Sequence, residues 1–331
     1  MPSIHVQAHP GKPPIVHSPA DLGLAAAVQW LSDNRKEIRD ELPHRGMLMI
    51  RNLPIAGADD FAAVRDVLTD QRAVYREQAT PRSAFGRDVF SSTDLPARQS
   101  LRLHNENSYT LEFPGLLMFC CLQAPGAGGA TTVADVREVL ARLPETLVDR
   151  FRKVGWQLRR NYHDDVGLPW TTAFGTDSRE SVAGYCRDNL IAYDWIGHSG
   201  LRTRQRRSAL VRHPVTGDEV WFNHAAFWSR WSLEPEVLQA LRLSYRDDGL
   251  PFDTAFGDGS ELTAEDVAAL NDAYDHATRR ERWRPGDVLL VDNVLAAHGR
   301  DSYRGTRRIL VAMGEPTSLA ACSPTVAPAA A

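Results

Sequence analysis

The sequence predicts a mainly β protein, a barrel or a sandwich with helices on its outside, and three observations support this class. Past residue 80, short strand-like runs recur between turn signals made of Gly, Pro and Asp. Helical patterns lie between some of these runs, as expected for helices that cover a β core. The chain has 331 residues, 43% hydrophobic and 24% charged, which is the composition of a globular protein with a sizeable core.

The N-terminal elements follow from local signals. Residues 1–17 contain Pro and His without periodicity, so we expect an extended arm. Ser18-Pro19-Ala20-Asp21 combines a Ser cap, a Pro in the first turn and an acid three residues on, which predicts a helix from there to about Leu42. The apolar run Gly46–Arg51 predicts a buried strand, and a second helix should begin near Asp59.

The remaining elements are predicted by short apolar runs and by helical periodicity. The expected strands are Leu116–Leu122, Thr131–Ala134, Gln157–Tyr162, Val220–Phe222, Val288–Val291 and Arg308–Met313. The expected helices are Asp135–Leu143, Pro235–Tyr245 and Ala264–Arg280. Residues 317–331 are rich in Ala, Pro and Ser and are expected to form a disordered tail, which leaves residues 18–316 as one domain.

Charge and cysteine content exclude several classes of function. Lys and Arg number 38 against 42 Asp and Glu, a net charge of −4, so we expect neither nucleic acid nor a membrane surface as a partner. Four Cys are too few and too irregularly spaced for a disulfide scaffold or a CxxC zinc site. No signal peptide and no apolar run of about 18 residues is present, so we expect a cytoplasmic protein.

The chemistry is carried by the segment His104-Asn-Glu106 and by a distant histidine, His298. Residues i and i+2 of an extended backbone face the same way, so His104 and Glu106 can point into one cavity. A third ligand from a distant strand would complete a face. Two imidazoles and one carboxylate that leave about three positions open are typical of non-haem Fe(II) oxygenases.

Two adjacent arginines follow His298, and strand alternation separates them. Arg308 shares a face with Leu310, whereas Arg307 shares the other face with Ile309. One of the two arginines must therefore point into the protein. A guanidinium in an apolar strand requires an anion, and a dicarboxylate with one end on the metal would supply it.

Ordered motifs resemble those of a known family. HNE at 104–106, Gly128-Gly-Ala-Thr131, His213-Pro-Val-Thr-Gly217 and Trp283-Arg-Pro-Gly-Asp287 with Asp292-Asn293, His298 and Arg307-Arg308 resemble the Fe(II)/2-oxoglutarate dioxygenases of the TauD/TfdA superfamily. HNENSY at 104–109 and Val220-Trp-Phe-Asn-His224 resemble its syringomycin-type amino-acid β-hydroxylase branch. The resemblance runs from about residue 45 to 314.

This resemblance implies a fold, cofactors and site residues. The fold would be a double-stranded β-helix, the clavaminate synthase-like jelly-roll. His104, Glu106 and His298 would bind Fe(II), and Arg308 and Thr131 would hold the distal carboxylate of 2-oxoglutarate. With O2 as second cosubstrate, the expected reaction is hydroxylation of an unactivated carbon, with the β-carbon as the expected position, of an amino acid in specialised-metabolite biosynthesis, such as that of an antibiotic. Desaturation begins with the same hydrogen abstraction and stays open.

Substrate residues and partners are predicted from position alone. Arg102 on the strand of His104, Asn107 and Tyr109 behind the ligand pair, and Asn223 behind a predicted strand are candidates for substrate contacts. The basic run Arg202–Arg207 could dock an acidic carrier protein that presents a tethered amino acid.

Two other classes of protein use similar metal ligands. One is a zinc hydrolase, whose helical ligand pairs are usually HExxH or HxxE. The other is a non-catalytic metal-binding jelly-roll, which would not need an interior arginine.

Overall fold

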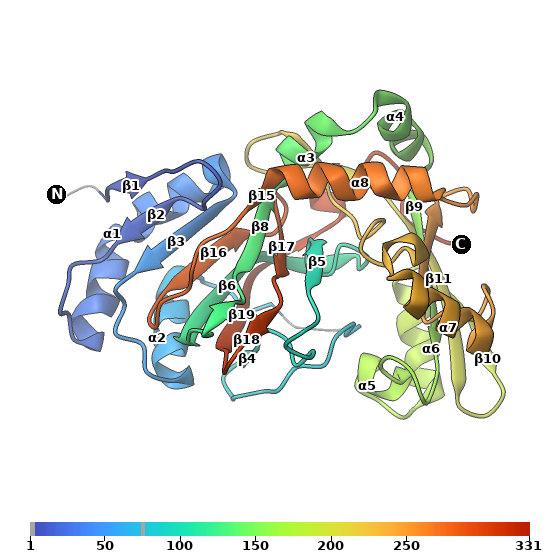
Figure 1. Ribbon diagram of the computed structural model, residues 1–331, viewed down its shortest axis with the longest axis horizontal. Coiled ribbons are helices and arrows are strands. Elements are labelled where there is room, and N and C mark those ends of the chain that lie inside the picture. The colour runs from blue at the N-terminus through green and yellow to red at the C-terminus, as the bar shows by residue number, and fades with distance from the viewer. Residues whose placement is uncertain (1–3, 74–76) are drawn as a thin grey trace.

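Two sheets form the centre of the molecule, and helices lie outside them (Figure 1). The structure, a computed structural model, describes residues 4–73 and 77–331 of the chain. The predicted mainly β architecture with peripheral helices is confirmed, and the two central sheets form a jelly-roll.

The larger sheet has seven strands and is antiparallel except where β2 runs parallel to β3. Its strands are, in order, β1 (Val6–Gln7), β2 (Ile15–His17), β3 (Met47–Arg51), β16 (Val288–Asp292), β6 (Glu112–Gln123), β19 (Arg308–Ser318) and β4 (Val89–Ser91). The four runs predicted as strands near residues 47, 116, 288 and 308 therefore all lie in this sheet, although β6 and β19 extend beyond their apolar runs.

The smaller sheet contains the strands that carry the two candidate histidines. Its order is β15 (Thr278–Arg279), β8 (Thr131–Asp135), β17 (Ala296–Arg300) and β5 (Leu101–His104). Between the sheets, Phe119 and Leu289 of the larger sheet pack in one apolar cluster with Val133 and Ala296 of the smaller sheet. A two-stranded ladder of β7 (Ala127–Gly128) and β18 (Tyr303–Arg304) lies nearby.

Helices α1 (Leu24–Arg45) and α2 (Ala58–Leu68) cover the outer face of the larger sheet (Figure 1). Leu31 and Phe61 are fully buried there in the same cluster as Leu310. The predicted start of the first helix at Ser18 is wrong: α1 begins after Gly23, and the Ser18 hydroxyl instead donates to the Asn52 carbonyl. Ser18 therefore holds the N-terminal arm beside β3 and does not cap a helix.

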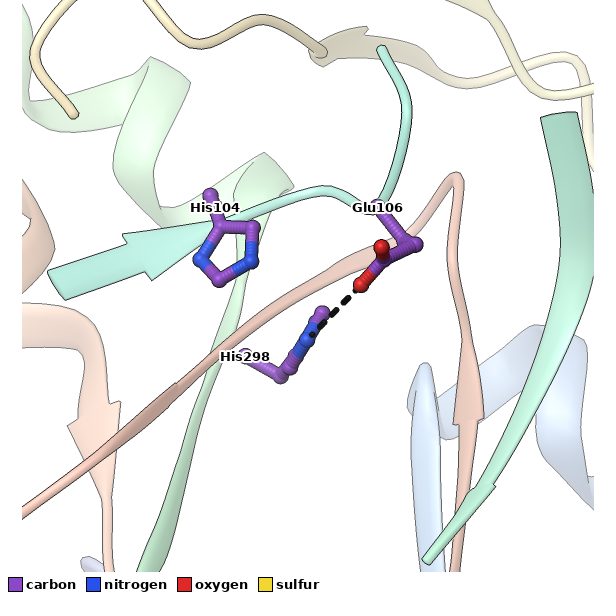
Figure 2. A group of neighbouring side chains, drawn as sticks. All are labelled: His104, Glu106 and His298. Carbon is purple, nitrogen blue, oxygen red and sulfur yellow. Dashed lines mark ion pairs between the residues drawn. The ribbon is translucent and has the colours of Figure 1, made fainter. Parts of the chain in front are cut away.

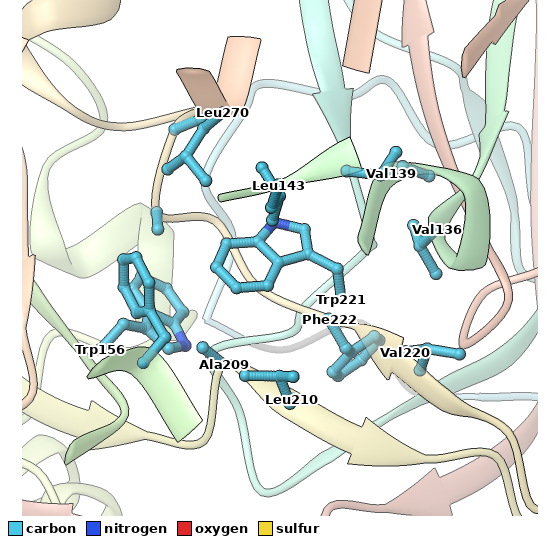
Figure 3. Close-up of a cluster of buried hydrophobic side chains, with 14 of the residues drawn as sticks. Val136, Val139, Leu143, Trp156, Ala209, Leu210, Val220, Trp221, Phe222 and Leu270 are labelled. Carbon is cyan, nitrogen blue, oxygen red and sulfur yellow. The ribbon is translucent and has the colours of Figure 1, made fainter. Parts of the chain in front are cut away.

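The middle of the chain adds a further sheet beside the jelly-roll. Its strands are β10 (Ala192–Ile196), β11 (Gly200–Arg207), β9 (Trp156–Tyr162) and β14 (Phe252–Phe256), and a separate hairpin joins β12 (Leu210–Arg212) to β13 (Glu219–Trp221). The helices around it are α3 (Val136–Arg142), α4 (Glu145–Val154), α5 (Trp170–Phe174), α6 (Arg179–Asp188), α7 (Pro235–Tyr245) and α8 (Ala264–Ala277), and a 3₁₀ turn spans Arg230–Ser232. Trp156, Trp221 and Phe222 are among the large buried side chains of a core that also contains residues of α3 and α8 (Figure 3).

The C-terminal residues 317–331 are ordered, so the predicted disordered tail is wrong. They complete β19, form a 3₁₀ turn at Ala320–Cys322 and end with β20 (Ala329–Ala330), which pairs with β11. The Thr325 amide donates to the Ser208 hydroxyl at 3.0 Å. Small side chains let this backbone approach the sheet closely, and the contacts are long-range hydrogen bonds that leave no local periodicity in the sequence.

Across residues 4–73 and 77–331, none of the helices is both long enough and apolar enough to cross a lipid bilayer.

Candidate metal centre

Three predicted ligand residues converge in the interior of the jelly-roll (Figure 2). His104 ends β5, Glu106 lies in the loop that follows, and His298 is in β17, directly opposite His104 in the antiparallel register. The His104 and His298 rings are 4.4 Å apart between centroids, and Glu106 Oε2 lies 3.4 Å from His298 Nε2. One possible ligand atom from each residue lies within 4.8 Å of the others, and all three residues are buried.

The loop that carries Glu106 is held by an asparagine on the opposite side of the chain. Asn293 Oδ1 accepts from the Glu106 amide at 2.7 Å, and its Nδ2 donates to the Glu106 carbonyl at 2.9 Å. The Asn105 amide group in turn donates to the Asn293 carbonyl at 2.7 Å. The Asp292-Asn293 pair of the sequence motif therefore positions the carboxylate through its backbone.

The protonation states suit a divalent metal ion. Burial, followed by the neighbouring His298, lowers the pKa of His104 to about 3, so this imidazole is neutral at pH 7. Its Nδ1 lies 2.9 Å from the Arg102 carbonyl, which leaves Nε2 with a lone pair for a ligand. Burial opposes ionisation of Glu106, but the charge of Arg82 and the hydrogen bond from His298 outweigh it and hold the pKa of this carboxyl below its usual range.

Arg82 is a residue of this site that sequence analysis did not identify. Its Nη2 donates to both carboxylate oxygens of Glu106, at 3.0 and 2.9 Å, and both side chains are buried. Arg82 comes from the irregular segment between α2 and β4 and belongs to no motif. No periodicity or spacing in the sequence signals it, because the contact depends on how the residues just before β4 pack against the loop of Glu106.

Arg307, not Arg308, faces the cavity above the three ligand residues. Its Nη2 donates to Thr131 Oγ1 at 3.1 Å, its Nη1 to Ser92 Oγ at 3.1 Å and its Nε to the Gly129 carbonyl at 2.9 Å. Arg308 is exposed on the other face of β19. The expectation that Arg308 lines the site is therefore wrong, whereas Thr131 lies where it was expected.

The strand parity explains this correction. Ile309 and Val311 pack in the cluster between the two sheets, whereas Leu310 lies in the cluster under α1 and α2. Arg307 shares the parity of Ile309, so it points toward the interior of the jelly-roll. Burial lowers the pKa of Arg307 to about 10, so the guanidinium is charged at pH 7.

Two of the four candidate substrate residues lie elsewhere. Arg102 is exposed, outside this cavity, and donates to Asn271 Oδ1 at 3.2 Å. In the antiparallel pairing of β5 with β17, His104 lies opposite His298 and Leu101 lies opposite Arg300. Three residues along β5 therefore match two along β17, which makes a bulge in β5. Because of this bulge, Arg102 and His104 no longer face the same side of the sheet. Asn223 is buried away from the cavity, where its amide donates to the Ala209 carbonyl and accepts from the Ala225 amide.

Asn107 and Tyr109 do line the cavity, and so does His224, which the sequence showed only as the end of a motif. The Tyr109 hydroxyl donates to the Glu77 carbonyl at 2.8 Å and lies 3.3 Å from Asn107 Oδ1. His224 is a buried member of the same wall, and its Nδ1 lies 2.6 Å from the Ser108 hydroxyl. The residues directly after the ligand pair therefore form one side of the cavity.

Comparison with known proteins places the chain among oxygenases. The family model "Taurine catabolism dioxygenase TauD, TfdA family" matches residues 7–313. The dapdiamide synthesis protein DdaC of Enterobacter agglomerans is 35% identical over 279 residues, which cover 84% of this chain and 85% of that protein.

Solved structures show the same fold. A taurine dioxygenase from Burkholderia xenovorans superposes with a TM-score of 0.52 at 16% identity over 96% of this chain and 92% of that chain. PvcB, described as an Fe, alpha-ketoglutarate dependent oxygenase from an isonitrile synthetic pathway, superposes with a TM-score of 0.51 at 17% identity over 92% of this chain and 86% of that chain.

Proposed function

This chain belongs to the TauD, TfdA family of dioxygenases, and from that membership we propose that it hydroxylates a C–H bond of an amino-acid-derived substrate in a specialised-metabolite pathway. The enzyme is an Fe(II)- and 2-oxoglutarate-dependent dioxygenase. When bound, iron would oxidise the substrate with 2-oxoglutarate and O2. A C–H bond of the substrate becomes C–OH, and 2-oxoglutarate becomes succinate and CO2.

His104, Glu106 and His298 are the proposed iron ligands. They supply two imidazoles and one carboxylate from one side of the cavity, which leaves positions for cosubstrate and O2. The neutral His104 ring and the ionised Glu106 carboxylate are the ligand forms that Fe(II) requires. In this proposal, Arg82 does not bind the iron. It hydrogen-bonds the Glu106 carboxylate and so fixes the orientation of that carboxylate.

Arg307 and Thr131 are the proposed partners of the distal carboxylate of 2-oxoglutarate. Each nitrogen of the Arg307 guanidinium has one neutral partner, which leaves two of its five N–H groups for a carboxylate. No Asp or Glu side chain forms a hydrogen bond or ion pair with Arg307 among the residues the structure describes. The single observation that carries the proposal is this guanidinium opening into the cavity of the three ligand residues.

The docking of an acidic carrier protein at Arg202–Arg207 remains a prediction. This run lies within strand β11. Arg207 is fully buried, while Arg202 lies 3.7 Å from Asp248 and Arg204 lies 3.3 Å from Asp194. Part of its charge is therefore already paired. Charge reversal at Arg204 and Arg206 should slow turnover of a carrier-bound substrate but not of a free one; equal rates with both would exclude the docking.

Coupled turnover tests the proposed function. Purified protein with Fe(II), O2 and 2-oxoglutarate should release succinate above its uncoupled background when the correct amino-acid derivative is added. The product should contain one additional oxygen atom derived from O2. A product that has lost two hydrogens without gaining oxygen would instead identify a desaturase, and succinate release that no amino-acid derivative increases would contradict the proposal.

A further inference from the structure

The charged side chains around the cavity are mostly cationic. Arg82, Arg300 and Arg307 are among the residues that line it, against the single acidic residue Glu106. Glu106 is already engaged by Arg82 and by His298, and it is a proposed iron ligand. Iron and 2-oxoglutarate carry opposite charges of equal formal size, so binding both leaves the excess of positive charge in place.

A substrate ammonium group would find no anionic partner in this cavity. Glu106 is the one acidic side chain among the described residues that line it. An aromatic ring can also bind a cation over its face, but both faces of Trp228 are covered. His224 stacks on Trp228 at 4.3 Å, and Phe252 stacks on it at 4.8 Å.

The other aromatic wall residues are similarly engaged. Phe227 packs against the His104 ring at 4.4 Å and against His224 at 5.3 Å. The wall also carries the neutral hydroxyls of Thr80 and Thr93. Hydroxyl groups of this kind suit an amide in the substrate, whereas an ammonium among them would lose its hydration without a compensating charge.

We propose that the substrate enters this cavity as an anion, with a free carboxylate and with its amino nitrogen masked as an amide, as in an N-acyl amino acid. The inference rests on the proposed function and narrows its substrate class. A zwitterionic free amino acid would bring an ammonium into a cationic cavity. A carrier-bound aminoacyl thioester would bring the ammonium and lack the carboxylate, so this inference argues against the predicted docking of a carrier protein at Arg202–Arg207.

Anaerobic binding separates this inference from the proposed function. The Fe(II) protein with 2-oxoglutarate should show a weak visible charge-transfer band, and a ligand that binds beside the iron should perturb it without turnover. If the band itself is missing from folded, iron-loaded protein, the proposed function fails. If the band is present, the substrate class can be tested with ligands alone.

Matched ligand sets provide that test. Each amino acid is compared with its N-acetyl derivative and with the N-acetyl amide, which lacks the carboxylate. At least one N-acetyl amino acid should bind about tenfold more tightly than both of its matched forms, equivalent to about 1.4 kcal/mol. The inference is overturned if free amino acids or an aminoacyl carrier bind as tightly, or if no N-acetyl amino acid perturbs an existing band.

A pair of isosteric variants tests the role of the cavity charge. Ala79 is a partly buried wall residue and is not among the proposed partners of iron or 2-oxoglutarate. Ala79→Asp should weaken binding of the best N-acetyl amino acid about tenfold, because it adds a carboxylate to the wall. Ala79→Asn has the same shape without the charge and should change binding less than about twofold. Equal effects of the two variants, each retaining the charge-transfer band, would mean that cavity charge does not select the substrate.

Discussion

Replacing Arg307 by Gln should remove most of the affinity for 2-oxoglutarate. The Arg307 guanidinium is partly buried, is charged at pH 7 and forms three hydrogen bonds to neutral oxygens at 2.9 to 3.1 Å. It is thus held rigidly toward the cavity with two N–H groups left for an anion.

The magnitude follows from the loss of a charged partner in a buried site. Removing one member of such a charge pair costs about 2–5 kcal/mol. A loss near 3 kcal/mol corresponds to a rise of about 150-fold in the dissociation constant of 2-oxoglutarate. Arg308→Gln is the matched control, since Arg308 is adjacent in sequence but exposed on the opposite face of β19.

The assay is an anaerobic titration of 2-oxoglutarate into Fe(II)-loaded protein, followed through the visible charge-transfer band. Arg308→Gln should bind 2-oxoglutarate within about twofold of the unaltered protein, because an exposed charge far from the ligand contributes little. A large loss of affinity in Arg308→Gln with none in Arg307→Gln would refute the assignment of the cavity-facing arginine.

Three further predictions test the support of the site and the fold. Asn293→Ala should weaken Fe(II) or Co(II) binding about tenfold or more in a metal titration, because it releases the backbone of Glu106; unchanged affinity would exclude this positioning role. Burial raises the pKa of Asp287 from 3.8 to about 6, so its ionisation destabilises the fold as pH rises through that window. Denaturant unfolding should therefore show Asp287→Asn gaining about 3 kcal/mol relative to the unaltered protein between pH 4 and 7, whereas a constant difference would contradict the shift. Gly299→Ala should lower the stability measured by thermal unfolding by about 1–3 kcal/mol, because a Cβ there would lie 2.5 Å from the Leu101 carbonyl oxygen. The control Gly184→Ala, whose added Cβ would have its nearest neighbour at 3.9 Å, should be neutral or stabilising. Equal stability of the two variants would show that β5 can move to accommodate the added Cβ.

Local patterns predicted β8 and β19 near the site, because an apolar run between turn signals specifies a buried strand wherever it packs, but the expected strands did not include β5 and β17, which carry the two histidines. The alternation of residues along β19 also predicted that only one of Arg307 and Arg308 points inward. Which face is inward depends on the sheet that β19 meets, and the resemblance in sequence selected the wrong arginine. Ile309 in the cluster between the sheets identifies the inner face.

Long-range contacts account for what the sequence could not predict. The bulge in β5 that separates Arg102 from His104 arises from pairing with β17, nearly two hundred residues away in the chain. Arg82 reaches Glu106 from an irregular loop, and the C-terminal strand β20 pairs with β11 without an apolar pattern of its own. Hydrogen bonds between distant segments leave no periodicity in either segment, so no single window of sequence signals them.

The central claim is that His104, Glu106 and His298 bind one ferrous ion. The most direct measurement is the Fe(II) content and affinity of the single Ala variants at these positions after anaerobic loading, with His276→Ala in the last turn of α8 as the control. Each of the three variants should lose stoichiometric iron and the charge-transfer band with 2-oxoglutarate, while His276→Ala retains both. Full iron occupancy with an intact band in any folded variant of the three would contradict the account.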